Sequence, residues 1–138
     1  MNSILMDSGP LVAYLNKADQ HHSWAVGQFD ALEEPVLTCE PVWTEAMYLI
    51  TKRGGDSDAL WRVLRSRVVE FTFHLKNEYE SVAALMRRYT DVPMSLADAC
   101  MVRMSEIQAE CRVFTTDSHF KFYRRFGRQV IPVLSPHS

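Results

Sequence analysis

Hydrophobic positions along the chain fall into short continuous runs that alternate with longer stretches of helical spacing. A short apolar run bounded by polar residues predicts a strand that is buried on both faces of a sheet. The predicted strands cover residues 4–6, 36–38, 68–73, 113–115 and 130–133.

The longer stretches predict helices, because their apolar residues recur with a period near 3.6. The predicted helices cover residues 10–16, 22–32, 41–53, 58–67, 77–89, 96–109 and, as a short segment, 118–126. Gly54 and Gly55 end the third of these helices. Strands that alternate with helices favour an α/β fold with a mainly parallel sheet covered on both faces.

Composition narrows the class of protein further. A chain of 138 residues, with 47% apolar and 23% charged residues, is typical of one folded domain rather than a disordered chain. The formal net charge of −2 excludes a protein that binds nucleic acid over its whole surface. Any contact with nucleic acid must therefore come from a local basic patch.

The cysteine pattern predicts a cytoplasmic protein. Cys39, Cys100 and Cys111 are odd in number and lie far apart, so neither a disulfide framework nor a zinc site is indicated. A reducing compartment fits best. We see no signal peptide and no apolar run near the roughly 20 residues that span a bilayer, so no membrane association is expected.

Four carboxylates stand in apolar surroundings. Glu45 and Asp98 lie within helices that are apolar on nearly every face, and such helices are normally buried. Asp7 and Asp117 each follow a predicted strand. A buried carboxylate is costly unless it is paired, hydrogen-bonded or bound to a metal, so these positions need an explanation.

The predicted topology brings the four acids to one edge of the sheet. In an α/β fold, the carboxyl end of a strand and the amino ends of its flanking helices share that edge, which is where open sheets bind ligands. Asp7 and Asp117 leave strands there, and Glu45 and Asp98 lie near the starts of helices that begin there. The joint placement favours a functional site.

Each acid, taken alone, has a structural alternative. Asp98 fits a capping box begun by Ser95, Asp117 fits a helix cap, and Asp7 fits a turn before Pro10. Glu45 lies inside its helix, where no such explanation applies.

Four carboxylates in one pocket repel each other, and a divalent cation resolves this repulsion. Ligands that are all oxygen suit Mg²⁺ or Mn²⁺ rather than zinc. Such a cation can activate water and stabilise a phosphate under attack, which is the chemistry of phosphodiester hydrolysis.

These residues resemble those of the PIN-domain nucleases and, within them, the VapC-like toxins of bacterial toxin–antitoxin pairs. The resemblance covers essentially the whole chain, residues 1–138, as a single domain. It rests on four motifs in order along the sequence: Asp7-Ser8, Thr44-Glu45-Ala46, Leu96-Ala97-Asp98-Ala99 and Thr115-Thr116-Asp117-Ser118-His119-Phe120.

The resemblance implies a three-layer α/β/α sandwich and Mg²⁺- or Mn²⁺-dependent cleavage of RNA. Its catalytic acids would be Asp7, Glu45, Asp98 and Asp117, with the three aspartates as metal ligands. Supporting positions would be Ser8, Thr115 and the peripheral Asp91. The resemblance also implies a cognate antitoxin and a homodimer.

A basic segment follows Asp117 directly and is interleaved with aromatic residues. Its cations are Lys121, Arg124, Arg125 and Arg128. They are candidates to hold the RNA backbone near the metal. The alternative is a solvated helix face with an apolar underside.

Three other functions compete. A phosphatase that forms an acyl phosphate on Asp7 needs a second acid two residues later, where the chain has Gly9. A non-catalytic module would use the acidic pocket to bind a basic peptide. A PIN-domain nuclease of RNA processing would act without an antitoxin.

Overall fold

A computed structural model of the protein describes residues 2–137. Its centre is a five-stranded sheet of order β3-β2-β1-β4-β7, in which every neighbouring pair is parallel. The strands are β1 (Ser3–Met6), β2 (Val36–Thr38), β3 (Val69–Phe71), β4 (Cys111–Phe114) and β7 (Val133–Leu134). The predicted parallel sheet is confirmed.

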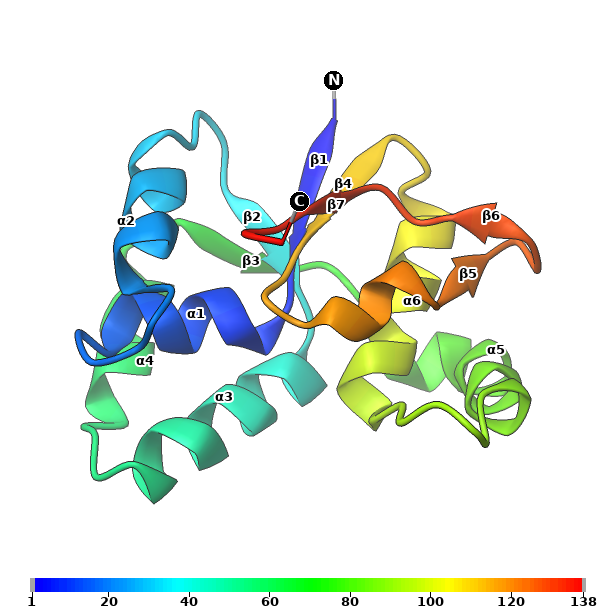
Figure 1. Ribbon diagram of the computed structural model, residues 1–138, viewed down its shortest axis with the longest axis horizontal. Coiled ribbons are helices and arrows are strands. Elements are labelled where there is room, and N and C mark those ends of the chain that lie inside the picture. The colour runs from blue at the N-terminus through cyan, green and yellow to red at the C-terminus, as the bar shows by residue number, and fades with distance from the viewer. Residues whose placement is uncertain (1, 138) are drawn as a thin grey trace.

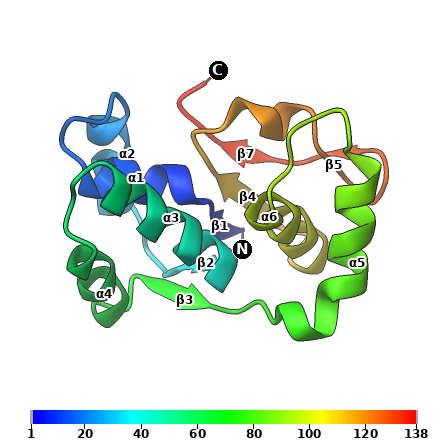
Figure 2. The same cartoon turned by 90° about the horizontal axis from the view of Figure 1, so that it is seen from below.

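Helices cover both faces of this sheet, as Figures 1 and 2 show. They are α1 (Ser8–Leu15), α2 (His22–Asp30), α3 (Glu40–Lys52), α4 (Asp58–Arg65), α5 (Leu75–Arg88) and α6 (Leu96–Ile107). In Figure 1, α1, α2 and α4 lie on one side of the sheet and α5 and α6 on the other. The α/β/α arrangement is confirmed.

Alternation along the strands builds two cores. Successive side chains of a strand point to opposite faces. Leu5 and Val113 therefore enter the core beneath α5 and α6, whereas Met6 and Phe114 enter the core beneath α1 to α4. The carboxyl-terminal halves of β1 and β4 are thus buried on both faces, and the polar groups that follow them lie at the sheet edge.

The end of the chain departs from prediction. The helix expected over residues 118–126 is only a 3₁₀ turn, η1 (Ser118–Lys121), followed by a hairpin of β5 (Arg124–Arg125) and β6 (Gln129–Val130). The chain reverses at Phe126 and Gly127, whose φ angles are 52° and 80°. A left-handed backbone of this kind ends a helix and suits glycine.

The last predicted strand is also split. Val130 belongs to the hairpin, and the main sheet receives β7 only after Pro132. Pro132 has no N–H to donate, but its carbonyl accepts a hydrogen bond from the backbone N–H of Val113 at 2.8 Å. Within the described residues, none of the helices is both long enough and apolar enough to cross a membrane.

Candidate active site

Three aspartates meet at the carboxyl edge of the sheet. Asp7 ends β1 and caps α1, Asp117 follows β4 and caps η1, and Asp98 lies in the first turn of α6. One carboxylate oxygen from each lies within 4.8 Å of the other two. Since β1 and β4 pair in parallel with Met6 opposite Phe114, the residues that follow them are held side by side.

Asp7 is almost fully enclosed, with 3% of its surface exposed. Its Oδ1 accepts the N–H of Ser8 at 2.8 Å, and its Oδ2 accepts the hydroxyl of Thr115 at 2.8 Å. Burial, together with the nearby charge of Asp98, nevertheless raises the pKa of Asp7 from 3.8 to about 7. When no metal is bound, the surroundings of Asp7 therefore favour its protonated, neutral form.

Asp98 has the capping-box geometry that the sequence allowed. Its backbone N–H donates to Ser95 Oγ at 3.1 Å, and the Ser95 N–H donates to Asp98 Oδ2 at 3.1 Å. The hydroxyl of Tyr123 also donates to Oδ2, at 3.3 Å. Burial raises the pKa of Asp98, and the charges of Asp117 and Glu45 raise it further. Capping and membership of the cluster therefore coexist in one side chain.

Asp117 combines the same two roles. Its Oδ1 accepts the backbone N–H of His119 at 2.9 Å and lies 2.8 Å from Nδ1 of the same residue. Its own N–H donates to Thr115 Oγ1 at 2.9 Å. Because the Thr115 hydroxyl also donates to Asp7, this one side chain fixes the positions of two of the three aspartates.

Glu45 stands at the rim of the cluster rather than inside it. The hydroxyl of Ser8 donates to Glu45 Oε1 at 2.5 Å, and that of Ser95 donates to Oε2 at 3.4 Å. Ser8 directly follows Asp7 in the chain, and Ser95 caps the helix that carries Asp98. Two serines thus connect the fourth acid to the aspartates.

The donor set fits a hard divalent cation. All three contributing groups are carboxylates, and oxygen ligands suit Mg²⁺ or Mn²⁺ better than zinc. The hydrogen bonds given above use only Oδ2 of Asp98 and only Oδ1 of Asp117, so each residue retains a second oxygen for coordination. Cation binding would also offset the repulsion from Asp98, which adds to burial in raising the pKa of Asp7.

Of the remaining residues predicted to support the site, two contact the acids and one does not. Ser8 and Thr115 contact the acids directly, as described above. Asp91 is exposed in the loop between α5 and α6, and among the described residues no hydrogen bond or ion pair connects it to the cluster. Tyr123, which donates to Asp98, was not singled out from the sequence, because nothing local distinguishes it from the neighbouring aromatic residues.

The basic segment requires one correction. Arg125 is buried, with 4% of its surface exposed, and its Nη1 donates to the carbonyls of Ser105 at 2.8 Å and Ala109 at 2.9 Å. It satisfies the carboxyl end of α6 and is not free to contact RNA phosphates. Lys121 and Arg128 are exposed and Arg124 is half-buried.

A parallel sheet that gathers three carboxylates at its carboxyl edge defines an α/β protein with a candidate metal site. The chain matches the PIN domain family over residues 4–125, so it belongs to that family. The predicted family resemblance is confirmed.

Two relatives illustrate the likeness. The chain is 27% identical to Ribonuclease VapC26 of Mycobacterium tuberculosis over 129 residues, which cover 90% of this chain and 94% of that protein. It also superimposes on the crystal structure of M. tuberculosis VapC20, described as a sarcin-ricin loop cleaving toxin. That match has a TM-score of 0.76 and 21% identity, and it covers 84% of this chain and 91% of the other.

Proposed function

We propose that this PIN-domain protein is a ribonuclease that hydrolyses RNA phosphodiester bonds with Mg²⁺ or Mn²⁺ held by Asp7, Asp98 and Asp117. The observation that carries the proposal is the convergence of these three carboxylates within 4.8 Å at the ligand-binding edge of the sheet. A full-length relative that is named as a ribonuclease supports it.

The bound cation would lower the pKa of water and stabilise negative charge on the phosphate under attack. The protein's own residues do the positioning. Thr115 fixes Asp7 and Asp117, and the Ser95 cap fixes Asp98. In the reaction, the attacking water loses a proton as its oxygen bonds to phosphorus, the bridging P–O bond breaks, and the leaving oxygen takes a proton from solvent.

Glu45 is the carboxylate best placed to accept the proton that the attacking water loses. It lies outside the group of three aspartates, so its carboxylate is not required as a ligand. The serine hydroxyls of Ser8 and Ser95 hold it at the rim. We assign it the acceptance of a proton from the attacking water.

The exposed cations of the C-terminal segment support substrate binding. Lys121 and Arg128 reach solvent on the segment that begins at Asp117, and Arg124 is half-buried beside them. We propose that these three side chains contact RNA phosphates near the metal site, since such contacts set affinity without reading sequence.

We further propose that the protein is the toxin of a toxin–antitoxin pair, forms a homodimer and acts in the cytoplasm. The likeness to VapC20, which is described as a toxin, supports the first part. The homodimer is what the family resemblance implies. The free thiols of Cys39, Cys100 and Cys111 suit a reducing compartment. Growth arrest on expression, relieved by the product of an adjacent reading frame, tests the pairing, and light scattering tests the dimer.

The test of activity is cleavage of a panel of structured RNAs by the purified protein. We expect cutting with Mg²⁺ or Mn²⁺ and none with excess EDTA. Cutting that persists in EDTA would remove the metal from the proposal. Tight metal binding without cutting of any RNA would favour a binding module instead.

A further inference from the structure

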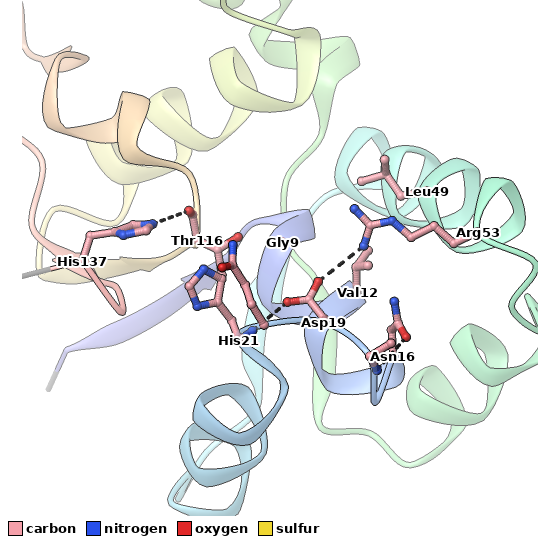
Figure 3. Close-up of a pocket in the computed structure, with 11 residues that line it drawn as sticks. Gly9, Val12, Asn16, Asp19, His21, Leu49, Arg53, Thr116 and His137 are labelled. Atoms are coloured by element: carbon pink, nitrogen blue, oxygen red, sulfur yellow. Dashed lines mark hydrogen bonds and ion pairs between the residues drawn. The ribbon is translucent and has the colours of Figure 1, made fainter.

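A polar cavity of about 650 Å³ opens next to the segments that follow β1 and β4, where it is lined by Gly9 and Thr116. Figure 3 shows its walls, which come from α1, the loop before α2, the end of α3, the segment after β4, and the C-terminal tail. Its volume lies in the range of about 300–1,000 Å³ that small-molecule sites occupy. We call it the Arg53 pocket, and its chemistry is set by Gly9, Asp19, His21, Arg53, Thr116 and His137.

Two wall residues place this pocket against the site. Gly9 lies two positions after Asp7, and Thr116 directly precedes Asp117. A Cβ on Gly9 would lie only 2.0 Å from Thr116 Oγ1, so a larger residue would require the Thr116 side chain to move. The pocket is therefore lined by two tightly packed residues that are neighbours of two of the three aspartates in the sequence. A strand of RNA whose phosphate lies at the aspartates would have a neighbouring nucleotide at the pocket.

Arg53 supplies a positive charge at the pocket. Its Nη1 lies 3.4 Å from Asp19 Oδ2, while Asp19 Oδ1 accepts the backbone N–H of His21 at 2.9 Å. The Arg53 side chain is 50% exposed, whereas that of Asp19 is 17% exposed. Asp19 is therefore mostly buried, and the Arg53 guanidinium reaches solvent. A guanidinium has five N–H donors, and the contact with Asp19 occupies one nitrogen.

Two imidazoles form a second wall. The ring nitrogen Nε2 of His137 lies 2.8 Å from the carbonyl oxygen of Thr116. Because a carbonyl only accepts, Nε2 carries the proton. The rings of His21 and His137 meet edge to face, with centroids 5.5 Å apart and an interplanar angle of 88°. Such rings provide both a stacking surface and hydrogen-bonding edges for an unpaired RNA base.

We propose that the Arg53 pocket binds one nucleotide of the RNA substrate beside the scissile phosphate. The base packs against His21 and His137, and the backbone phosphate contacts Arg53. This inference rests on the proposed ribonuclease function and adds to it a position at which the enzyme selects its substrate. The acidic cluster repels phosphate when no metal is bound, whereas the positive charge of Arg53 in the neighbouring pocket would attract the RNA backbone.

The first test follows the histidine NMR signals of the full-length protein without divalent metal. Each of the four 5′-nucleoside monophosphates, and inorganic phosphate alone, is titrated in turn. We expect saturable shifts of the His21 and His137 signals with at least one nucleotide, larger than those with phosphate. Arg53→Gln should weaken that binding roughly tenfold, as for loss of a hydrogen bond to a charged group.

Arg65→Gln is the matched control, because it removes the same charge from an exposed arginine on α4 outside the pocket. Its binding should equal that of the wild type. The proposal is overturned if no nucleotide shifts the two histidine signals, or if both arginine variants behave alike. Shifts caused by a protein partner and by no nucleotide would assign the pocket to that partner instead.

The second test is cleavage of a randomised RNA library with Mn²⁺. We expect His137→Ala, which removes one of the two rings assigned to the base, to cut RNA but to lose nucleotide preference at one position next to the cut, while Arg65→Gln keeps it. An unchanged preference in His137→Ala overturns the selection role. If the wild type cuts no RNA, the proposed function fails, whereas the metal-free titration still decides whether the pocket binds a nucleotide.

Discussion

The hydroxyl of Thr115 donates to Asp7 Oδ2 at 2.8 Å, joining the ends of two neighbouring strands across 108 positions of sequence. The oxygen of that Thr115 hydroxyl, Oγ1, also accepts a hydrogen bond from the backbone N–H of Asp117 at 2.9 Å. One buried hydroxyl therefore holds in register two carboxylates that we propose bind the metal. Thr115 is thus a position where the geometry of the site can be altered without removing any charge.

We expect Thr115→Val to weaken both the metal site and the fold. The valine keeps the shape but leaves Asp7 Oδ2 and the Asp117 N–H without this partner, which costs about 1–3 kcal/mol for a buried group. Calorimetric Mg²⁺ titration and urea unfolding measure the two effects. Thr115→Ser, which restores the hydroxyl, should recover most of the metal affinity. Equal behaviour of Val and Ser would show that the hydroxyl is not used.

Removing one anionic oxygen should stop catalysis. We expect Asp7→Asn and Asp98→Asn to abolish RNA cleavage with Mg²⁺ or Mn²⁺ while the circular dichroism spectrum stays that of the wild type. Asp30→Asn is the control, since Asp30 is an exposed acid at the end of α2. Wild-type turnover in either active-site variant would contradict the assignment.

The metal-free protein should lose stability as pH rises. The pKa of Asp7 is raised from 3.8 to about 7 by burial and by Asp98, and that of Asp98 is raised as well. Between about pH 4 and pH 7 the native state holds a proton that the unfolded state has released, so the free energy of unfolding falls across that window.

Urea unfolding in EDTA across that window measures this dependence. Asp7→Asn should flatten the curve, and added Mg²⁺ should restore stability at the high-pH end by binding only the folded protein. Stability that rises between about pH 5 and pH 7 in the wild type would refute the repulsion argument.

Charge neutralisation at Asp117 should not harm the metal-free fold. Asn retains an Oδ1 that can accept the His119 N–H, while like-charge repulsion with Asp98 is removed. We expect the metal-free melting temperature of Asp117→Asn to equal or exceed that of the wild type. Mg²⁺ should raise the melting temperature of the wild type more than that of the variant. A large metal-free loss would mean that capping dominates.

The basic segment should separate into binding and structural residues. Lys121→Gln combined with Arg128→Gln should weaken RNA binding, measured in Ca²⁺, and flatten the plot of log affinity against log salt by about 0.7 to 0.9 per lost contact. Arg125→Gln should instead lower the stability of the fold, by about 2 kcal/mol, since it leaves the α6 carbonyls unpaired. An unchanged salt slope in the double variant would show that Lys121 and Arg128 do not contact RNA phosphates. Binding of the RNA backbone would then have to involve other cations, such as Arg53.

The sequence predicted the acidic edge because the relevant signals are local. Asp7 and Asp117 directly follow apolar runs, and in a parallel sheet the ends of such runs must meet. The helix caps at Asp98 and Asp117 could be predicted as well, because capping also depends on neighbouring residues in the sequence. Pattern and topology together were sufficient for the sheet, most helices and the convergence of the three aspartates at one edge.

The remainder depends on contacts distant in sequence. Arg125 looks like its exposed neighbours, and only the unpaired carbonyls at the end of α6, on Ser105 and Ala109, give it a buried place. The hairpin that carries it depends on the positive φ angles of Phe126 and Gly127, and periodicity does not report them. The Arg53 pocket needs His137 from the C-terminal tail, which no motif connects to α1.

Arg125 has a consequence for how far the protein can be shortened. Helix α6 is fastened at one end by the Ser95 cap beside Asp98, and at the other by the guanidinium of Arg125. A fragment ending at Phe122 would keep all four acids, yet it would free the far end of the helix that carries one of them. A fragment that keeps α6 fixed at both ends must therefore extend at least through Arg125. We expect a cut before that residue to loosen the carboxyl end of α6 without removing any of the four acids.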